Sequence, residues 1–279
     1  MSRKTALVTG ANSGMGLATA TELARRGYRV VMACRSLERG EAARQQAIRE
    51  SGSADIELMS CDLGSLSAIR QFAERFLAIH DVLDVLVNNA GVITVKRHTT
   101  SDRFEAMMGV NHLGHFLLTN LLLPAIRRSP QGRIVVVSSG AHKAGKIHFE
   151  DPHLTRRFNA VKGYAQSKLA NVLFARELAE RLQGGTVTVN AVHPGAVATN
   201  FGVDRRTGFG RSVYKMLRPF FRTSAEGAAT AIYLATSDEV TGMTGQYFYD
   251  GKSAPISANA RDAASAKRLW AWSEREVGL

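Results

Sequence analysis

Short apolar runs alternate with longer segments of mixed apolar and polar residues along almost the whole chain. The apolar runs have the length of buried strands, whereas the mixed segments have the composition and length of helices. We expect strands at residues 4–9, 28–34, 55–61, 82–87, 132–140, 186–192 and 245–249. We expect helices at residues 17–26, 38–50, 65–78, 108–116, about 164–182, 224–235 and 258–276. This alternation predicts an α/β fold, a doubly wound parallel sheet of about seven strands with helices on both faces.

No linker or internal repeat divides the chain, so residues 1–279 are expected to form a single domain. A helical tail is expected at about residues 256–279. The segment at about 200–223 is irregular and combines glycines, aromatics and arginines. Such a segment is typical of a lid over an apolar substrate. A solvated loop with a short helix, or an amphipathic piece on a membrane surface, is an alternative interpretation.

The first expected strand runs directly into a glycine-rich loop. The loop reads Gly10-Ala11-Asn12-Ser13-Gly14-Met15-Gly16 and is followed by helix formers that stop at Gly27. Glycines let the backbone turn tightly and let a pyrophosphate approach the helix N-terminus, where free N–H groups favour negative charge. The spacing differs from G-x-G-x-x-G, and a structural turn is the alternative. Its place between a strand and a helix favours a Rossmann-type dinucleotide site.

The second expected strand is followed by Arg35 and Ser36. An acid at this place would bind the 2′-hydroxyl of NAD, whereas a basic residue accommodates the 2′-phosphate of NADP. A guanidinium pairs with phosphate in a bidentate way, and a serine adds a second donor. The pair therefore favours NADP(H) over NAD(H), although an arginine at a strand end is also simply an exposed side chain.

Polar or small residues follow the next two strands and interrupt the following helix. Asp62 and Leu63 end the third strand, where the carboxylate is suited to an adenine amino group or to capping the next helix. After the fourth strand, Asn89-Ala90-Gly91 would let a cofactor lie against the strand end. Asn111 lies in an apolar helix, where an unpaired amide is costly, so it is either bonded locally or functional.

A Tyr-x-x-x-Lys pair follows the fifth strand. Tyr164 and Lys168 are four residues apart, so on a helix they lie on one face. A fixed ammonium stabilises a phenolate, which would lower the tyrosine pKa toward working pH and suit it to acid–base chemistry. The pair alone is a weak signal, because a solvated helix face often carries it by chance. Serines such as Ser139 at the strand end are either turn formers or ligand-binding groups.

Composition and charge narrow the class of protein. The apolar content of 45% and charged content of 22% are those of a globular protein. The net charge is +12, but the basic residues are scattered, so no nucleic-acid partner is expected. No apolar run is long enough for a transmembrane segment, and no signal peptide is recognisable, so a cytoplasmic protein is expected. His112 and His115 are near each other without a third ligand, and no metal site is expected.

The sequence resembles the short-chain dehydrogenase/reductase family over roughly residues 4–250. Within the family it looks like the retinol-dehydrogenase-like and WW-domain-oxidoreductase-like branch. The motifs that carry the resemblance are Thr9-Gly10-x-x-x-Gly14-x-Gly16, Asp62, Asn88-Asn89-Ala90-Gly91, Asn111, Ser139, Tyr164-x-x-x-Lys168 and Pro194-Gly195.

The resemblance implies an NADP(H)-dependent oxidoreductase, with NAD(H) as the alternative cofactor. Tyr164 would be the general acid/base, Ser139 would bond the same substrate oxygen, and Ser138 is the less favoured of the two serines. Lys168 would lower the Tyr164 pKa and hold the nicotinamide ribose, with Asn111 keeping a water in a proton path. The resemblance implies that Val197 and Thr199 contact the nicotinamide carboxamide, and that Pro194 and Gly195 also bind the cofactor.

The resemblance also implies a small-molecule partner, a lipophilic carbonyl or alcohol. Membrane-bound members carry an N-terminal anchor that this sequence does not show, which favours a soluble relative over a retinoid enzyme. A non-catalytic, redox-sensing dinucleotide-binding regulator is the main alternative, and its signature would be loss of Ser139, Tyr164 or Lys168. An epimerase or dehydratase would carry a larger C-terminal substrate domain. The sequence leaves open the substrate, the direction of the reaction and whether the protein is a homo-oligomer.

Overall fold

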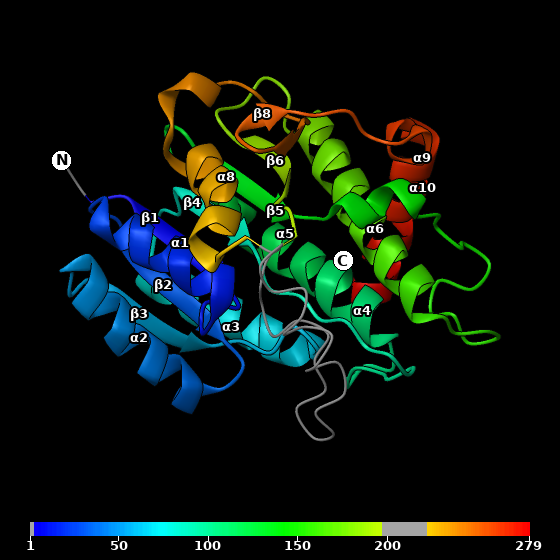
Figure 1. The fold of residues 1–279 in the computed structure, drawn as a ribbon, viewed down its shortest axis with the longest axis horizontal. Coiled ribbons are helices and arrows are strands. Elements are labelled where there is room, and N and C mark those ends of the chain that lie inside the picture. Colours follow the sequence, from blue (N-terminus) through cyan, green and yellow to red (C-terminus); the bar gives the residue numbers. More distant parts are fainter. Residues whose placement is uncertain (1–2, 197–221) are drawn as a thin grey trace.

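The computed structural model of the protein describes residues 3–196 and 222–279. At its centre lies one sheet with strand order β3-β2-β1-β4-β5-β6-β7-β8 (Figure 1). All neighbouring pairs are parallel except β7 and β8. The strands are β1 (Thr5–Thr9), β2 (Arg29–Cys34), β3 (Ile56–Ser60), β4 (Val85–Asn88), β5 (Arg133–Val137), β6 (Thr188–His193), β7 (Tyr247–Tyr249) and β8 (Lys252–Ser253). The predicted doubly wound parallel sheet is confirmed.

Strand β8 is one strand more than the sequence pattern predicted. It is two residues long and pairs with β7 across a turn at Asp250 and Gly251. Both turn residues have positive φ, 54° and 71°, which is the backbone that an Asp-Gly hairpin favours. A polar strand of this length produces no apolar run in the sequence. Only the Asp-Gly pair could have indicated the hairpin.

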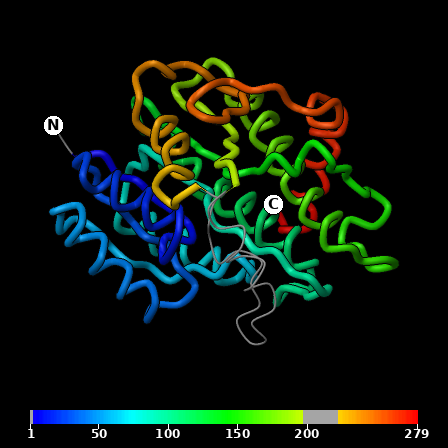
Figure 2. Tube along the Cα trace, in the orientation of Figure 1, coloured from blue at the N-terminus to red at the C-terminus, as the bar shows by residue number. Residues whose placement is uncertain are grey.

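Helices cover both faces of the sheet (Figures 1 and 2). The longer helices are α1 (Gly14–Arg25), α2 (Leu37–Ser51), α3 (Leu66–Ile79), α5 (Gly114–Arg127), α6 (Ala160–Arg181), α8 (Ser224–Thr236) and α10 (Ala263–Val277). One apolar core joins α1, α2 and α8 to the sheet, and a second joins α3, α5, α6 and α10 to the other face. Alternate residues of β1 serve the two cores, since Ala6 and Val8 face the first and Leu7 the second.

Two helical segments differ from the predicted pattern. The expected helix at 108–116 consists of the short α4 (Ala106–Met108), a π-helical turn η1 (Gly109–Leu113) and the start of α5. Such turns are frequent at functional sites, and this one carries Asn111. The expected polar helix of the tail is divided into α9 (Ala258–Arg261) and α10, with Asp262 capping the second.

Helix α10 is amphipathic rather than polar throughout, because Trp270 and Trp272 are buried. Trp270 packs against Phe116 of α5 and Phe174 of α6, with ring centroids 4.8 and 6.0 Å away. In Figure 2 the red C-terminal segment accordingly lies against the green segment that carries α6. In the described ranges, no helix is both long enough and apolar enough to span a bilayer.

Candidate active site

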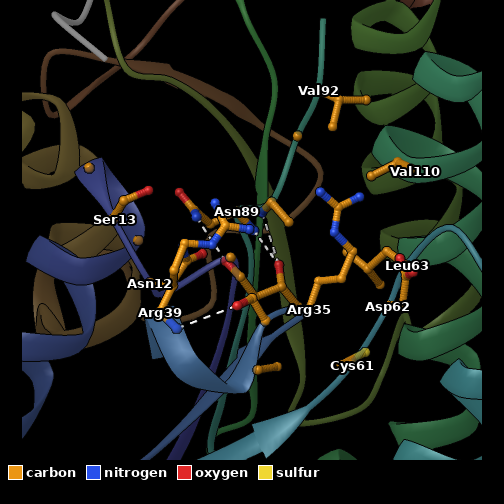
Figure 3. Close-up of a pocket in the computed structure, with 18 of the residues that line it drawn as sticks. Asn12, Ser13, Arg35, Arg39, Cys61, Asp62, Leu63, Asn89, Val92 and Val110 are labelled. Atoms are coloured by element: carbon orange, nitrogen blue, oxygen red, sulfur yellow. Dashed lines mark hydrogen bonds between the residues drawn. The ribbon is translucent and has the colours of Figure 1, made fainter. Parts of the chain in front are cut away.

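A cavity of about 310 Å³ opens where β1, β2, β3 and β4 end (Figure 3). It brings together the residues predicted from the glycine loop and from the ends of the second, third and fourth strands. The predicted residues that line it are Gly10, Asn12, Ser13, Gly14, Met15, Gly16, Arg35, Ser36, Asp62, Leu63, Asn89, Ala90 and Gly91. Thr9, the first residue of the glycine motif, also lines it. So do residues that the sequence did not single out, namely Ala33, Arg39, Cys61, Val92 and Val110.

The glycine loop is shaped so that a ligand can approach the backbone closely. Gly10 has φ +64°, and a Cβ there would lie 2.9 Å from the Ala90 Cα. A Cβ on Gly16 would overlap the Gly10 carbonyl oxygen. Ser13 precedes α1, but its side chain makes no cap hydrogen bond to the first turn. The first-turn N–H groups and this hydroxyl therefore suit the pyrophosphate of a dinucleotide.

Two arginines stand at the side of the cavity formed after β2. The side chains of Arg35 and Arg39 both reach toward it in Figure 3, and neither pairs with a carboxylate within the described residues. Ser36 accepts a hydrogen bond from the Arg39 backbone N–H at 3.4 Å and so caps α2. Its hydroxyl hydrogen is not used by that bond. The cluster has the donors that a phosphate needs.

The two interpretations of Asp62 can now be separated. Helix α3 is capped by Ser65, whose hydroxyl accepts from the Ala68 N–H at 3.3 Å. Asp62 accepts instead from the Gly64 N–H at 2.9 Å while it lines the cavity. The capping alternative is therefore wrong, because Ser65 occupies the cap position. The second carboxylate oxygen of Asp62 remains suited to a ligand amino group.

The Thr9 hydroxyl at the end of β1 forms several hydrogen bonds, and this role was not predicted from the sequence. Its hydroxyl accepts from the backbone N–H groups of Asn89 and Ala90 at 2.9 and 3.0 Å. It also lies 2.8 Å from His115 Nε2. The Asn89 side chain donates to the Thr9 carbonyl oxygen at 2.8 Å. Thr9 thus fixes the end of β4 against the glycine loop, and only its position before Gly10 hinted at this role.

Tyr164, Ser139 and Lys168 meet beside the same edge of the sheet. Tyr164 and Ser139 are hydrogen-bonded, and the Lys168 ammonium lies over the Tyr164 ring, 5.7 Å from its centroid. Lys168 Nζ donates to the Val137 carbonyl oxygen at 3.3 Å. Burial lowers the pKa of Lys168 to about 8. The serine, tyrosine and lysine of the sequence prediction are therefore neighbours.

The direction of the Tyr164 pKa differs from the prediction. Burial raises the pKa of Tyr164, and the hydrogen bond with Ser139 opposes that rise only in part. The expected lowering by Lys168 is not found, since the ammonium is bonded to Val137 O and lies over the ring face. Ser138, the less favoured serine, points away from this group and donates to the Lys168 carbonyl oxygen at 2.7 Å.

Asn111 is bonded on both sides of its amide. It accepts from the Val92 N–H at 2.7 Å, and its Nδ2 donates to Val92 O and to Ser167 Oγ, both at 3.0 Å. Ser167 in turn donates to the Tyr164 carbonyl oxygen at 2.9 Å. Asn111 therefore joins the loop after β4 to the helix that carries the tyrosine.

Pro194 and Gly195 follow the end of β6. Gly195 has φ +82°, and its N–H donates to His193 Nδ1 at 3.2 Å, just after Pro194. Val197 and Thr199 lie outside the described residues, as does the expected lid at 200–223 apart from its last two residues. Within the described ranges, no three His, Cys, Asp or Glu side chains are arranged to hold a metal ion.

Comparison with known proteins agrees with this geometry. A family model described as short chain dehydrogenase matches residues 4–208. Human retinol dehydrogenase 14 is 46% identical over 296 residues, which cover 100% of this chain and 88% of that protein. Retinol dehydrogenase 12 of Mus musculus is 43% identical over 276 residues, with 99% and 87% of the two chains covered.

Solved structures are similar over nearly the same length. A protein from Mycobacterium paratuberculosis superimposes with a TM-score of 0.79 at 37% identity, covering 99% of this chain and 94% of that one. A short chain dehydrogenase from Shigella flexneri, complexed with NADP, gives a TM-score of 0.71 at 24% identity, covering 89% and 97%. At that identity the second structure is informative about the fold alone.

Proposed function

The chain belongs to the short chain dehydrogenase family and is an NAD(P)-dependent oxidoreductase of the retinol-dehydrogenase-like branch; from this membership and the site, we propose that it interconverts a lipophilic carbonyl compound and its alcohol with NADP(H). One observation carries the proposal. The hydrogen-bonded Tyr164–Ser139 pair lies beside Lys168, at the same edge of the sheet as a cavity lined by the glycine loop and by Arg35.

The proposed chemistry uses the chain as an acid–base and positioning device. A bound nicotinamide supplies or accepts the hydride at the substrate carbon. In reduction, the Tyr164 hydroxyl gives its proton to the substrate oxygen as negative charge develops there. Ser139 donates a hydrogen bond to the same oxygen and so stabilises that charge. A raised tyrosine pKa keeps Tyr164 protonated and ready to act as an acid.

In this proposal, Lys168 provides a positive charge beside Tyr164, and Asn111 holds the helix of Tyr164 in position. The buried Lys168, with a pKa of about 8, stays largely protonated at neutral pH, so a positive charge lies over the ring of Tyr164. Its ammonium also has donors for the hydroxyls of a nicotinamide ribose. Asn111 keeps the π-helical turn attached to Val92 and Ser167, which holds the tyrosine helix at a fixed distance from the loop after β4.

Preference for NADP(H) rests on Arg35 and Arg39. Two guanidinium groups without carboxylate partners in the described structure have no other charge to neutralise, and a 2′-phosphate would do so. Charge-assisted hydrogen bonds contribute about 1.5–3 kcal/mol, so Arg35→Ala should weaken NADPH by about 10- to 100-fold. NADH affinity should change little.

The cofactor measurement needs a matched arginine. Arg44 lies on the same helix as Arg39 but pairs with Glu41 at 2.8 Å, outside the cavity. The dissociation constants for NADPH and NADH are measured by fluorescence titration. Their ratio should change in Arg35→Ala and Arg39→Ala but not in Arg44→Ala. An unchanged ratio in both cavity variants contradicts the assignment.

The substrate class is tested by turnover. The shared name of the relatives places long apolar aldehydes, the oxidised forms of such alcohols, first in a panel, followed by cyclic ketones and quinones. NADPH oxidation followed by absorbance should show higher kcat/KM for the lipophilic members than for short polar aldehydes. NADPH binding without turnover across the panel would favour the regulator alternative instead. The substrate lid at about 200–223 stays a prediction from the sequence.

A further inference from the structure

A line of buried polar side chains connects the C-terminal helix to Lys168. It begins at Ser273 of α10, which is completely buried although the helix faces solvent on its other side. The Ser273 hydroxyl lies 2.8 Å from Nε2 of His112, which is also buried and belongs to the π-helical turn. The His112 ring lies against Phe116 and Phe174, which offer no hydrogen-bonding groups to its ring nitrogens.

The line continues through Asn171 on α6. Asn171 is 1% exposed, and its Nδ2 donates to the Val137 carbonyl oxygen at 3.1 Å. Lys168 Nζ donates to the same oxygen at 3.3 Å. The two side chains are three residues apart on one helix, so both reach the end of β5 from the same face. A single carbonyl oxygen therefore serves the ammonium and the amide together.

The contact between His112 and Asn171 completes the line. His112 Nδ1 and Asn171 Oδ1 are both buried, and neither has a hydrogen-bond partner of ordinary geometry among the described residues. Burial lowers the pKa of His112 to about 3, against a smaller rise that comes from the adjacent Asn171 side chain. At neutral pH His112 is therefore an uncharged imidazole with one N–H donor.

The direction of every bond follows from the Val137 carbonyl. A carbonyl oxygen can only accept, so Asn171 turns its Nδ2 toward Val137 and its Oδ1 toward His112. A proton on His112 Nδ1 is the arrangement that suits this nearby acceptor oxygen. Its Nε2 is left as the acceptor, and Ser273 donates to it. The orientation at Lys168 and the hydroxyl on α10 are thus parts of one arrangement.

We propose that Asn171, His112 and Ser273 are positioning residues that set how firmly the Val137 carbonyl holds the Lys168 ammonium, and that they couple docking of α10 to the catalytic centre. The catalytic part of this statement rests on the proposed function of Lys168. The coupling itself concerns only residues of this chain.

Sharing the oxygen has a defined effect on Lys168. A carbonyl that already accepts from an amide is a weaker acceptor for the ammonium, and the positive end of the amide dipole faces the same charge. Among the residues that the structure describes, the other titratable groups near Lys168 are Tyr164 on its own helix and the neutral His115 on α5. Removing the Asn171 amide should therefore raise the pH at which Lys168 loses its proton.

The experiment follows the titration of Lys168 directly. Protein labelled with ¹³C at lysine Cε is titrated by NMR, and the Lys168 signal is assigned by its absence in Lys168→Met. Asn171→Leu should raise the midpoint by about 0.4 to 1 unit, the range that one net hydrogen bond corresponds to. Lys168 is already 3% exposed, so leucine adds little further desolvation. Ser273→Ala should move the midpoint in the same direction by a smaller amount.

Gln166→Leu is the matched control, since Gln166 is a buried amide on the same helix that binds His148 N and Pro152 O, both at 2.8 Å. It should leave the Lys168 midpoint unchanged. An unchanged or lower midpoint in Asn171→Leu overturns the proposal, as does an equal shift in the control. If Asn171→Leu does not fold, Ser273→Ala decides alone, and no shift there overturns the link to α10.

The pH profile of kcat separates this proposal from the enzymatic one. If Lys168 is catalytic, the profile of Asn171→Leu should move with the NMR midpoint, with KM nearly unchanged. Turnover retained by Lys168→Met would refute the proposed role of the lysine. A shifted NMR midpoint would still support the coupling in that case, so the two failures are distinguishable.

Discussion

Thr9 provides the sharpest test of how the nucleotide site is held together. His115 Nδ1 lies 3.1 Å from the Asn111 carbonyl oxygen, which can only accept, so Nδ1 carries the proton and Nε2 is an acceptor. The Thr9 hydroxyl must then donate to His115 Nε2 while it accepts from Asn89 N–H and Ala90 N–H. Every hydrogen-bonding capacity of this buried hydroxyl is used.

Thr9→Val keeps the shape of the side chain and removes these three bonds, together with a longer one of 3.4 Å from the Thr9 hydroxyl to the Val87 carbonyl oxygen. The Ala90 N–H and His115 Nε2 lose their partner beside the buried Thr9, whereas the Asn89 N–H keeps its hydrogen bond to the Val87 carbonyl oxygen at 2.9 Å. A buried group left unsatisfied costs about 1–3 kcal/mol, so two such groups should lower the free energy of unfolding by about 2–4 kcal/mol after partial relaxation. This is a large part of the 5–15 kcal/mol that is typical of a folded domain.

The assay is urea unfolding followed by circular dichroism, with and without NADPH. Thr9→Ser is the control, because it keeps the hydroxyl and loses one methyl group, and it should retain most of the stability. Asn89 and Ala90 also line the cavity, so the stabilisation by NADPH should be smaller in Thr9→Val than in the wild type. A loss below about 1 kcal/mol in Thr9→Val would refute the assignment of these bonds.

Burial lowers the pKa of His112 to about 3 and of His115 to about 4; the unfolded chain binds protons first, so stability should fall as pH drops through 6.5, by about 2 kcal/mol per histidine at pH 5. Denaturation at several pH values measures this, and a flat profile between pH 7 and 5 contradicts it. Gly10→Ala should weaken NADPH binding at least about tenfold, because this position imposes a positive φ on the alanine and its Cβ would clash with Ala90. Equal affinity for NADPH counts against a close-fitting loop. Burial raises the pKa of Cys34 to about 11 and of Cys61 to about 12, so thiol reagents should label both slowly at pH 8 until the protein unfolds; rapid labelling of the native protein would show the burial to be wrong.

Residue pattern alone was sufficient for the sheet and for most of the cavity. The β-branched runs and the glycine loop have a direct physical relation to strand burial and to a tight turn, so their positions could be predicted. The carboxyl ends of parallel strands meet at one edge, which brought Arg35, Asp62 and Asn89 together without knowledge of any contact.

Features that depend on packing were not predictable in the same way. The π-helical turn at Asn111, the bonds of Thr9 and the line from Ser273 to Lys168 join residues far apart in the sequence. The Tyr164 pKa was predicted with the wrong direction, because the four-residue spacing said nothing about burial or about Val137 competing for the ammonium. Periodicity identifies neighbours on a helix, but tertiary contacts decide what those neighbours bind.

The central claim is that Tyr164 is the acid of an NADPH-dependent carbonyl reduction. The most direct measurement compares wild type and Tyr164→Phe in NADPH oxidation with the best aldehyde of the panel, alongside the NADPH dissociation constant of each. We expect kcat to fall by about 10²- to 10⁴-fold, the usual contribution of a positioned acid, while the dissociation constant changes by less than about threefold. A Tyr164→Phe variant that keeps the wild-type kcat would contradict the claim.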